Sequence, residues 1–205
     1  MVVYVESNFV LEHALQQEQS ESCEELIRIA SVGSIHLVIP AFSLAEPHLA
    51  LSSKVKVRSK LGNDLLAQLS ELGRSKPFRE APGTFGELVS FLTGSAEREL
   101  EGLQLAIRRL LKTASVVPLD SMILHRAGEI QTSAGMSAQD SIVFASILSH
   151  LADTKPRQSC FLNRNTKDFD DPNVRELLNN LGCKFFGRFD DGLHYIESRL
   201  RETKV

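Results

Sequence analysis

The 205-residue chain has little of what builds disulfide-stabilised or zinc-stabilised domains. Its three cysteines, Cys23, Cys160 and Cys183, are odd in number, widely spaced and free of any C-x-x-C pair. This pattern argues against a disulfide framework and against a structural zinc site. The six histidines form no H-x-x-x-H pair, so no histidine-based metal site is indicated either. We expect the cysteines to be reduced thiols in the core.

Long apolar runs and an excess of positive charge are also missing. No stretch reaches the roughly 18 uninterrupted apolar residues of a membrane span, and the opening MVVYVESN has no basic segment typical of a signal peptide. We therefore expect a soluble, cytoplasmic protein with no membrane partner.

The net charge of −3 argues against binding polyanions by bulk charge. It leaves a nucleic-acid enzyme open, because cations bound at an acidic site restore local positive potential.

What the chain does contain is an alternation of short apolar runs with helical segments, which is typical of α/β architecture. At 42% hydrophobic residues it can form one substantial core. We predict one domain over 1–205, with a central, mostly parallel sheet in a three-layer α/β/α arrangement. A helical and loop-rich elaboration is expected at about 52–112, with the loop in 74–94. Strands are predicted at 2–5, 36–39, 116–119, 160–163 and 184–186, and helices at 9–16, 22–31, 96–113, 120–133, 137–149, 174–181 and from 190 or 191 to 200.

One acidic residue opens the most apolar of these helices. In the stretch MSAQDSIVFASILS, Ser137 is the expected N-cap and Asp140 the third helical residue, the spacing of a capping box. The positive end of the helix dipole favours an ionised carboxylate there, which suits a divalent cation. A plain capping role for Asp140 is the other interpretation, because Asp is a preferred residue at helix starts.

Other acids occupy comparable places. Ser43-x-x-Glu46 repeats the capping-box spacing, so Glu46 is expected at a helix N-terminus, where it too could simply be a cap. Glu6 directly follows the first strand, and Asn165 and Asp168 follow the strand CFLN. Parallel strands connected by right-handed crossovers end at one edge, where ligands bind in such sheets. Carboxylates gathered there require a compensating cation, and all-oxygen ligands favour Mg²⁺ or Mn²⁺ over Zn²⁺.

The blocks VVYVESNFVLEHAL, PAFSLAE, SAQDSIVFASIL and FLNRNTKDF resemble, in this order, the motifs of the PIN-domain family. The resemblance implies a PIN-like fold and metal-dependent hydrolysis of RNA phosphodiester bonds, as in bacterial toxins of the VapC type. The resemblance implies that Glu6, Glu46, Asp140 and Asp168 are the acids of the metal site and that Asn165 is an additional polar residue of this site. It implies RNA as substrate, with an antitoxin protein and a second copy of the chain, in a homodimer, as partners. Arg164 and Lys167 are the first candidates for positioning RNA, although both could be loop surface charges.

The chain departs from the family pattern in Glu6, where Asp is usual, in Asn163, where Thr or Ser is commoner, and in its extra length. Two other interpretations therefore stay open. One is a noncatalytic PIN-like module that binds RNA or a protein. The other is a phosphoacceptor or phosphatase-like α/β domain, which usually needs an aspartate at the end of the first strand.

Overall fold

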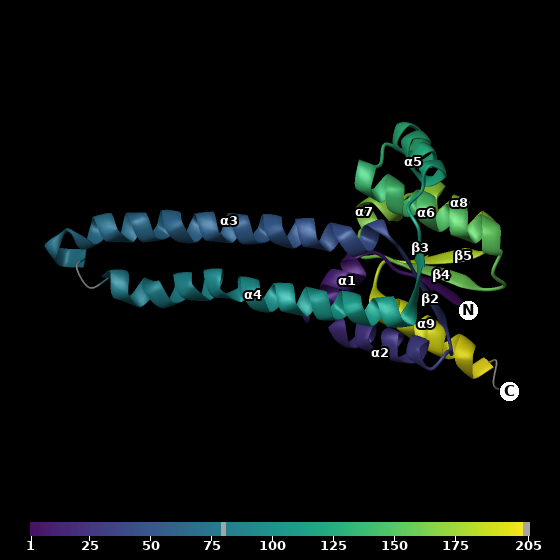
Figure 1. Cartoon of the computed structure of the whole chain (residues 1–205), viewed down its shortest axis with the longest axis horizontal. Helices are drawn as coiled ribbons and strands as arrows, with labels where there is room; N and C mark the ends of the chain where they lie inside the picture. The colour runs from purple at the N-terminus through teal and green to yellow at the C-terminus, as the bar shows by residue number, and fades with distance from the viewer. Residues whose placement is uncertain (79–80, 203–205) are drawn as a thin grey trace. The chain divides into compact units, whose positions relative to one another are not determined.

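The computed structural model describes residues 1–78 and 81–202, and the side chains in these ranges except those of residues 81–85 and 168. The chain divides into two compact units, of which one combines Met1–Pro47 with Leu103–Val205 and the other is His48–Gly102. The first unit carries the sheet (Figure 1). The second consists of the adjoining parts of two long helices and a short 3₁₀ turn.

The sheet has five strands, all parallel, in the order β3-β2-β1-β4-β5. β1 is central, with Tyr4 paired to Val38 on one side and to Phe161 on the other. These strands are short runs rich in apolar residues, as expected for a sheet covered on both faces. The strands are β1 (Val2–Tyr4), β2 (His36–Pro40), β3 (Ala114–Val117), β4 (Ser159–Leu162) and β5 (Cys183–Phe186).

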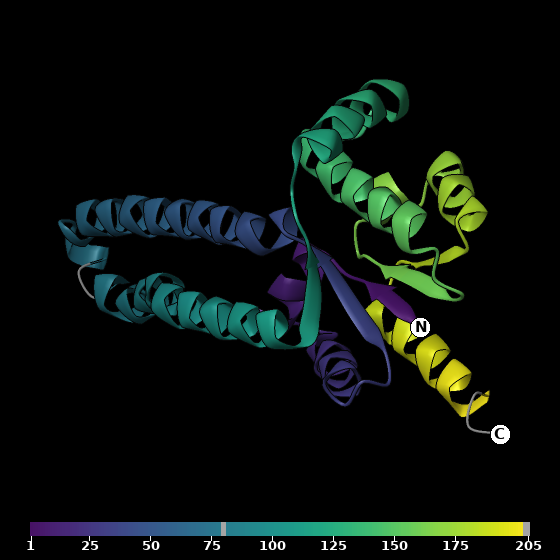
Figure 2. The ribbon, with the colours of Figure 1, turned by 45° about the vertical axis from the view of Figure 1, so that its right-hand side comes forward.

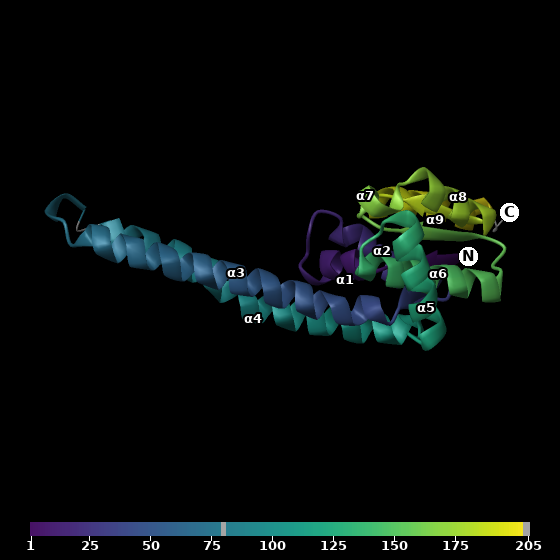
Figure 3. The same cartoon turned by 90° about the horizontal axis from the view of Figure 1, so that it is seen from above.

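Helices cover both faces of this sheet, which confirms the predicted three-layer α/β/α architecture (Figures 1 and 3). In one layer α2 contacts β2, and α9 contacts β4 and β5; in the other, α6 contacts β2 and β3, and α8 contacts β5. The helices of the first layer are α1 (Ser7–Ala14), α2 (Ser20–Ser31) and α9 (Phe189–Glu202), and those of the second are α5 (Ser121–Ala134), α6 (Ala138–Thr154), α7 (Thr166–Phe169) and α8 (Pro172–Asn180).

Buried side chains lie on both faces of the sheet: Phe9 of α1 meets Phe189 of α9 in the first layer, and a second cluster lies between the sheet and the other layer. Phe144 of α6 and Phe161 of β4 both meet Phe169 edge-on, with ring centroids 6.0 and 5.3 Å apart. All three phenylalanines are almost fully buried. The three cysteines are buried and free, as the sequence predicts. None of the described helices is both long enough and apolar enough to cross a membrane.

Several predicted helix starts are confirmed and others are wrong. Ser137 caps α6 by accepting the backbone N–H of Asp140, and Asp120 caps α5 by accepting that of Ile123. Ser22 is not a cap, because α2 already begins at Ser20. The Ser22 hydroxyl instead donates to Asp190, which lies inside the first turn of α9 rather than before it.

The second unit corrects the prediction for 74–94. α3 (Phe42–Gly73) and α4 (Ala81–Thr113) are long helices, separated by the 3₁₀ turn Lys76–Phe78 and residues 79–80 (Figure 2). The expected loop is therefore helical from Ala81 onward. Its glycines weaken an isolated helix by about 1 kcal/mol each, a cost that packing against a second helix can offset.

Candidate active site

Polar side chains gather where neighbouring strands of the first unit end. Glu6 lies two residues after β1, and Asn163 directly follows β4, which pairs with β1. Glu46 lies in the helix that follows β2, the other neighbour of β1. Because parallel strands end at the same edge, these side chains reach one place from distant parts of the sequence.

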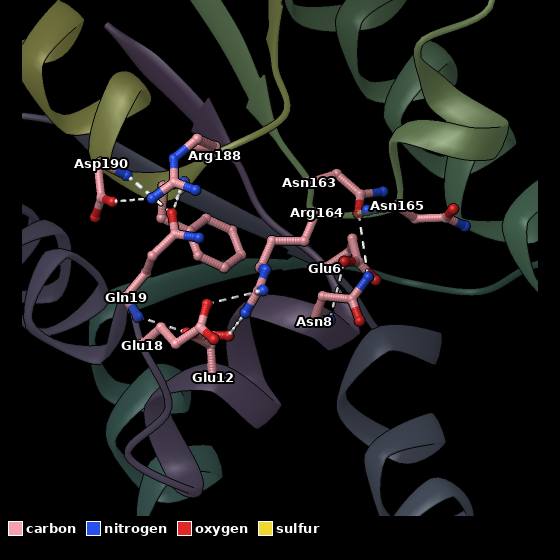
Figure 4. Close-up of polar contacts among 11 residues, drawn as sticks. Glu6, Asn8, Glu12, Glu18, Gln19, Asn163, Arg164, Asn165, Arg188 and Asp190 are labelled. Carbon is pink, nitrogen blue, oxygen red and sulfur yellow. Dashed lines mark hydrogen bonds and ion pairs between the residues drawn. The ribbon is translucent and has the colours of Figure 1, made fainter.

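Glu6 is the N-cap of α1 and is 5% exposed. Its Oε1 accepts the backbone N–H of Asn8 at 2.9 Å (Figure 4). The pKa of Glu6 is raised from 4.5 to about 8, mainly by burial and also by the nearby Glu46 and Asp140 carboxylates, against the opposing effect of the Asn8 N–H. Three acids predicted from the sequence therefore interact electrostatically at this site.

Glu46 accepts a hydrogen bond from the Ser7 hydroxyl, which ties α3 to the start of α1. Its predicted position at a helix N-terminus is wrong, because α3 begins at Phe42 and Glu46 is its fifth residue. The capping box does not form either, since the buried Ser43 hydroxyl has no hydrogen-bond partner among the described residues. Glu46 is held by tertiary contact rather than by local capping.

Asp140 caps its own helix and also contacts the segment after β4. Its Oδ2 accepts the Ser137 hydroxyl at 2.5 Å, which completes the reciprocal capping of α6. Its Oδ1 accepts the Asn165 amide at 3.1 Å. The cap orients one carboxylate oxygen, and the other reaches the residues after β4.

Asn163 is a residue of this site that the sequence did not predict. It is fully buried, and its Oδ1 accepts the Asn8 amide at 3.2 Å and the backbone N–H of Asn165 at 2.8 Å (Figure 4). Its Nδ2 is buried without a hydrogen-bond partner among the described atoms. The signal in the sequence was a polar residue directly after the apolar run CFL, which marks the end of a strand.

Arg164 is not directed at the site as an RNA-positioning residue would be. It pairs with Glu12, which is 1% exposed, and its Nη2 lies 3.5 Å from Glu18 (Figure 4). Glu12 also accepts the backbone N–H of Gln19 at 2.6 Å. This arrangement fastens the segment after β4 to α1, so Arg164 has a structural role here. Lys167 is exposed in α7.

The predicted ligand set is brought together in part. Glu6, Glu46, Asp140 and Asn165 lie at the site, whereas the side chain of Asp168 lies outside the described residues. No group of three or more His, Cys, Asp or Glu among the described side chains is arranged closely enough to hold a metal ion. A buried carboxylate beside two others nevertheless suits a hard cation, because positive charge removes their mutual repulsion. The metal site remains a prediction.

Comparison with known proteins gives little further information about the role of these residues. No family model matches the chain, and no curated protein matches it. Among solved structures, the crystal structure of VapBC2 from Rickettsia felis, bound to a DNA fragment from their promoter, is similar with a TM-score of 0.46. The sequences are 12% identical, and the match covers 90% of this chain and 98% of that one. At this level of similarity, the function has to be inferred from the site itself.

Proposed function

We propose that the chain is a divalent-metal-dependent ribonuclease of the PIN type that hydrolyses RNA phosphodiester bonds. The observation that carries this proposal is the buried Glu6 carboxyl, whose pKa is raised to about 8 by burial and by the carboxylates of Glu46 and Asp140. Burying such a carboxyl group lowers the stability of the fold, because its ionised form is unfavourable without nearby positive charge. Groups with strongly shifted pKa values cluster at functional sites.

In this proposal Glu6, Glu46 and Asp140 hold the cation, with Asp168 as the fourth acid implied by the family resemblance. A bound Mg²⁺ or Mn²⁺ would lower the pKa of a coordinated water and neutralise charge on the phosphate. Asn165 orients Asp140 through its amide, and Asn163 holds the backbone of Asn165.

The decisive experiment is cleavage of a labelled mixed-sequence single-stranded RNA with Mn²⁺, with Mg²⁺ and with EDTA. Asp140→Asn keeps the size of the side chain and removes its charge, and we expect it to lower the rate by at least ~100-fold, since changes even outside the metal ligands cost 10–100-fold. Asp153→Asn is the matched control, because Asp153 is an exposed acid of the same helix. Equal rates in all three proteins would contradict the assignment.

A noncatalytic RNA- or protein-binding module is the second candidate, and a specific observation favours it. Each of the three acids already accepts a hydrogen bond from this chain: Glu6 from Asn8, Glu46 from Ser7, and Asp140 from Asn165. Calorimetric titration with Mn²⁺ separates the two candidates. Absence of both Mn²⁺ binding and cleavage would place the binding module first, whereas Mn²⁺ binding without cleavage would indicate a narrow RNA target.

A toxin role with an antitoxin partner is the finer form of this proposal, and it rests on the resemblance of the sequence to VapC-type toxins. We expect expression of the wild type to arrest bacterial growth and Asp140→Asn to relieve the arrest. Asp153→Asn should remain as toxic as the wild type. Equal toxicity of Asp140→Asn would show that growth arrest does not come from this site.

A further inference from the structure

Two aromatic rings and a lysine lie together where β5 meets α9. The rings of Phe186 in β5 and Tyr195 in α9 are tilted by 38°, with their centroids 5.0 Å apart. The Lys184 ammonium lies over both rings, 5.2 Å from the centroid of Phe186 and 4.8 Å from that of Tyr195. Lys184 is exposed, and both rings are half-buried. We call these three residues the aromatic platform.

The sequence of β5 explains why these side chains meet. Side chains of a strand alternate between its two faces, so Cys183 and Phe185 enter the buried core whereas Lys184 and Phe186 reach the side of α9. Because β5 is an edge strand, these two side chains stand at the rim of the sheet. The platform is therefore open to solvent on the side of Lys184.

The charge of Lys184 is not offset by a carboxylate. No ion pair of Lys184 is found among the described side chains, and its ammonium lies over the two rings instead. Arg199 also lies over Tyr195, 5.3 Å from the ring centroid, but its guanidinium donates to Glu202 at 2.7 Å. Proteins that bind single-stranded nucleic acid combine such rings, on which bases stack, with cations that meet phosphates.

The platform adjoins the candidate active site. Phe186 is the last residue of β5, and its carbonyl accepts the backbone N–H of Asn163 at 3.0 Å. Asn163 in turn holds the backbone of Asn165. The next residue, Gly187, passes so close to α7 that a Cβ there would lie 2.7 Å from Cγ2 of Thr166. One end of the platform is thus joined to the segment that carries residues of the site.

We propose that the aromatic platform is a nucleobase-stacking site that holds one unpaired nucleotide of the RNA beside the cleavage site, an inference that rests on the proposed ribonuclease function. The base stacks on Phe186 and Tyr195, and Lys184 leaves the rings to meet a phosphate. This exchange is favourable, because a cation over an exposed ring contributes only ~2- to 5-fold to an equilibrium constant, whereas a base stacked on an aromatic side chain contributes ~5- to 150-fold.

The first test measures RNA binding rather than cleavage. A labelled mixed-sequence single-stranded RNA of about 12 nucleotides is titrated with the full chain by fluorescence anisotropy, in EDTA so that the RNA stays intact. Tyr195→Leu removes one ring and should weaken binding by ~5- to 50-fold, whereas Tyr195→Phe keeps the ring and should bind as the wild type does. Circular dichroism checks that both variants are folded. A wild type that binds no RNA, or a Tyr195→Leu that binds equally well, would overturn the proposal.

The salt dependence of binding tests Lys184 in a way that a merely structural role would not affect. Lys184→Gln should lower the slope of log K against log salt by ~0.7 between about 50 and 200 mM, the change for one lost phosphate contact on a single strand. Lys112→Gln is the matched control, because Lys112 is an exposed lysine that directly precedes Thr113 and β3, the opposite edge strand. Equal slopes in both variants would contradict a phosphate contact of Lys184.

Photo-crosslinking of the wild type needs no variant. RNA that carries 5-iodouracil is irradiated in the complex, and the crosslinked peptides are identified by mass spectrometry. A base stacked on the platform should crosslink to Phe186 or Tyr195, and crosslinks found exclusively at other residues would overturn the proposal.

These measurements separate the platform from the ribonuclease function. Metal-dependent cleavage together with unchanged RNA binding by Tyr195→Leu would remove the platform and leave the function in place. RNA binding that depends on Tyr195, without cleavage in Mn²⁺, would keep the platform and contradict the ribonuclease.

Discussion

The two units of this chain are stabilised in different ways. Met1–Pro47 with Leu103–Val205 folds around a sheet, and its core holds phenylalanines in edge-on contact. His48–Gly102 buries three hydrophobic side chains among its described residues and leaves nine large ones exposed. A sheet with two covering layers closes its own core, whereas two helices leave apolar surface in water. The first unit therefore buries its apolar side chains in its own core, whereas the second leaves most of its large apolar side chains in water.

The largest effect should come from the core of the first unit. Phe144→Ala removes a ring that is 1% exposed and should lower the free energy of unfolding by about 3–5 kcal/mol. Leu69→Ala in the second unit, at 8% exposed, should cost about 1–2 kcal/mol, because water can reach part of the space it leaves. Urea unfolding followed by circular dichroism compares the two. Equal losses would mean that the units are stabilised alike.

The next effect depends on pH. The pKa of Glu6 is about 8 in the folded protein against 4.5 for an ordinary glutamate, so between these values the folded state binds more protons and stability falls as pH rises. Glu6→Gln removes this penalty and should stabilise the metal-free protein by on the order of 3 kcal/mol at pH 8, with little effect near pH 4.5. Urea unfolding at both pH values measures this.

Adding Mn²⁺ to the same unfolding experiment tests whether the Glu6 carboxylate binds metal. It should raise the stability of the wild type at pH 8 more than that of Glu6→Gln, because only the wild type keeps all three carboxylates. A Glu6→Gln protein that is less stable than the wild type at pH 8 would show that the carboxylate is stabilised in some other way.

A smaller effect is expected from the ion pair that fastens the segment after β4 to α1. Arg164→Met leaves the buried Glu12 carboxylate without its cation and should cost about 2 kcal/mol, reduced from the fully buried case because Arg164 is one-third exposed. Adding Glu12→Gln to this variant should restore part of the loss. A double variant less stable than the sum of the two single changes would contradict this account.

The smallest effect is expected from the corresponding ion pair in the second unit. Arg58 and Glu99 join α3 to α4, and both keep more than a fifth of their side-chain surface exposed. Arg58→Met should therefore cost only about 0.5–1 kcal/mol, and less in high salt. Thermal unfolding in low and high salt checks this. A loss as large as that of Arg164→Met would remove the distinction between the two units.

Much of the fold follows from local sequence patterns. The runs VVYV, HLVI and CFLN became strands, and Ser137 and Asp120 became caps, because short-range sterics and hydrogen bonding decide such features. The prediction of a loop in 74–94 was wrong from Ala81 onward, for the opposite reason. The proline and glycines of this segment predict a loop locally, and the helix there depends on contact with a second helix.

The site was predicted in outline only. Glu6, Glu46, Asp140 and Asn165 were found because acids and amides next to strand ends and helix starts are recognisable in sequence. The contact that holds Glu46 in place could not be predicted, because its hydrogen-bond donor, Ser7, lies far away in the chain.

The sequence by itself determined the alternation of elements and the acids available for chemistry, since both depend on residue type and spacing. Only the tertiary structure decided that Asn163 belongs to the site, that Arg164 is engaged by Glu12, and that Glu6 is buried between like charges. The reason is physical. Burial, pairing and pKa depend on neighbours that strand order brings together, and the order β3-β2-β1-β4-β5 is a property of the folded chain.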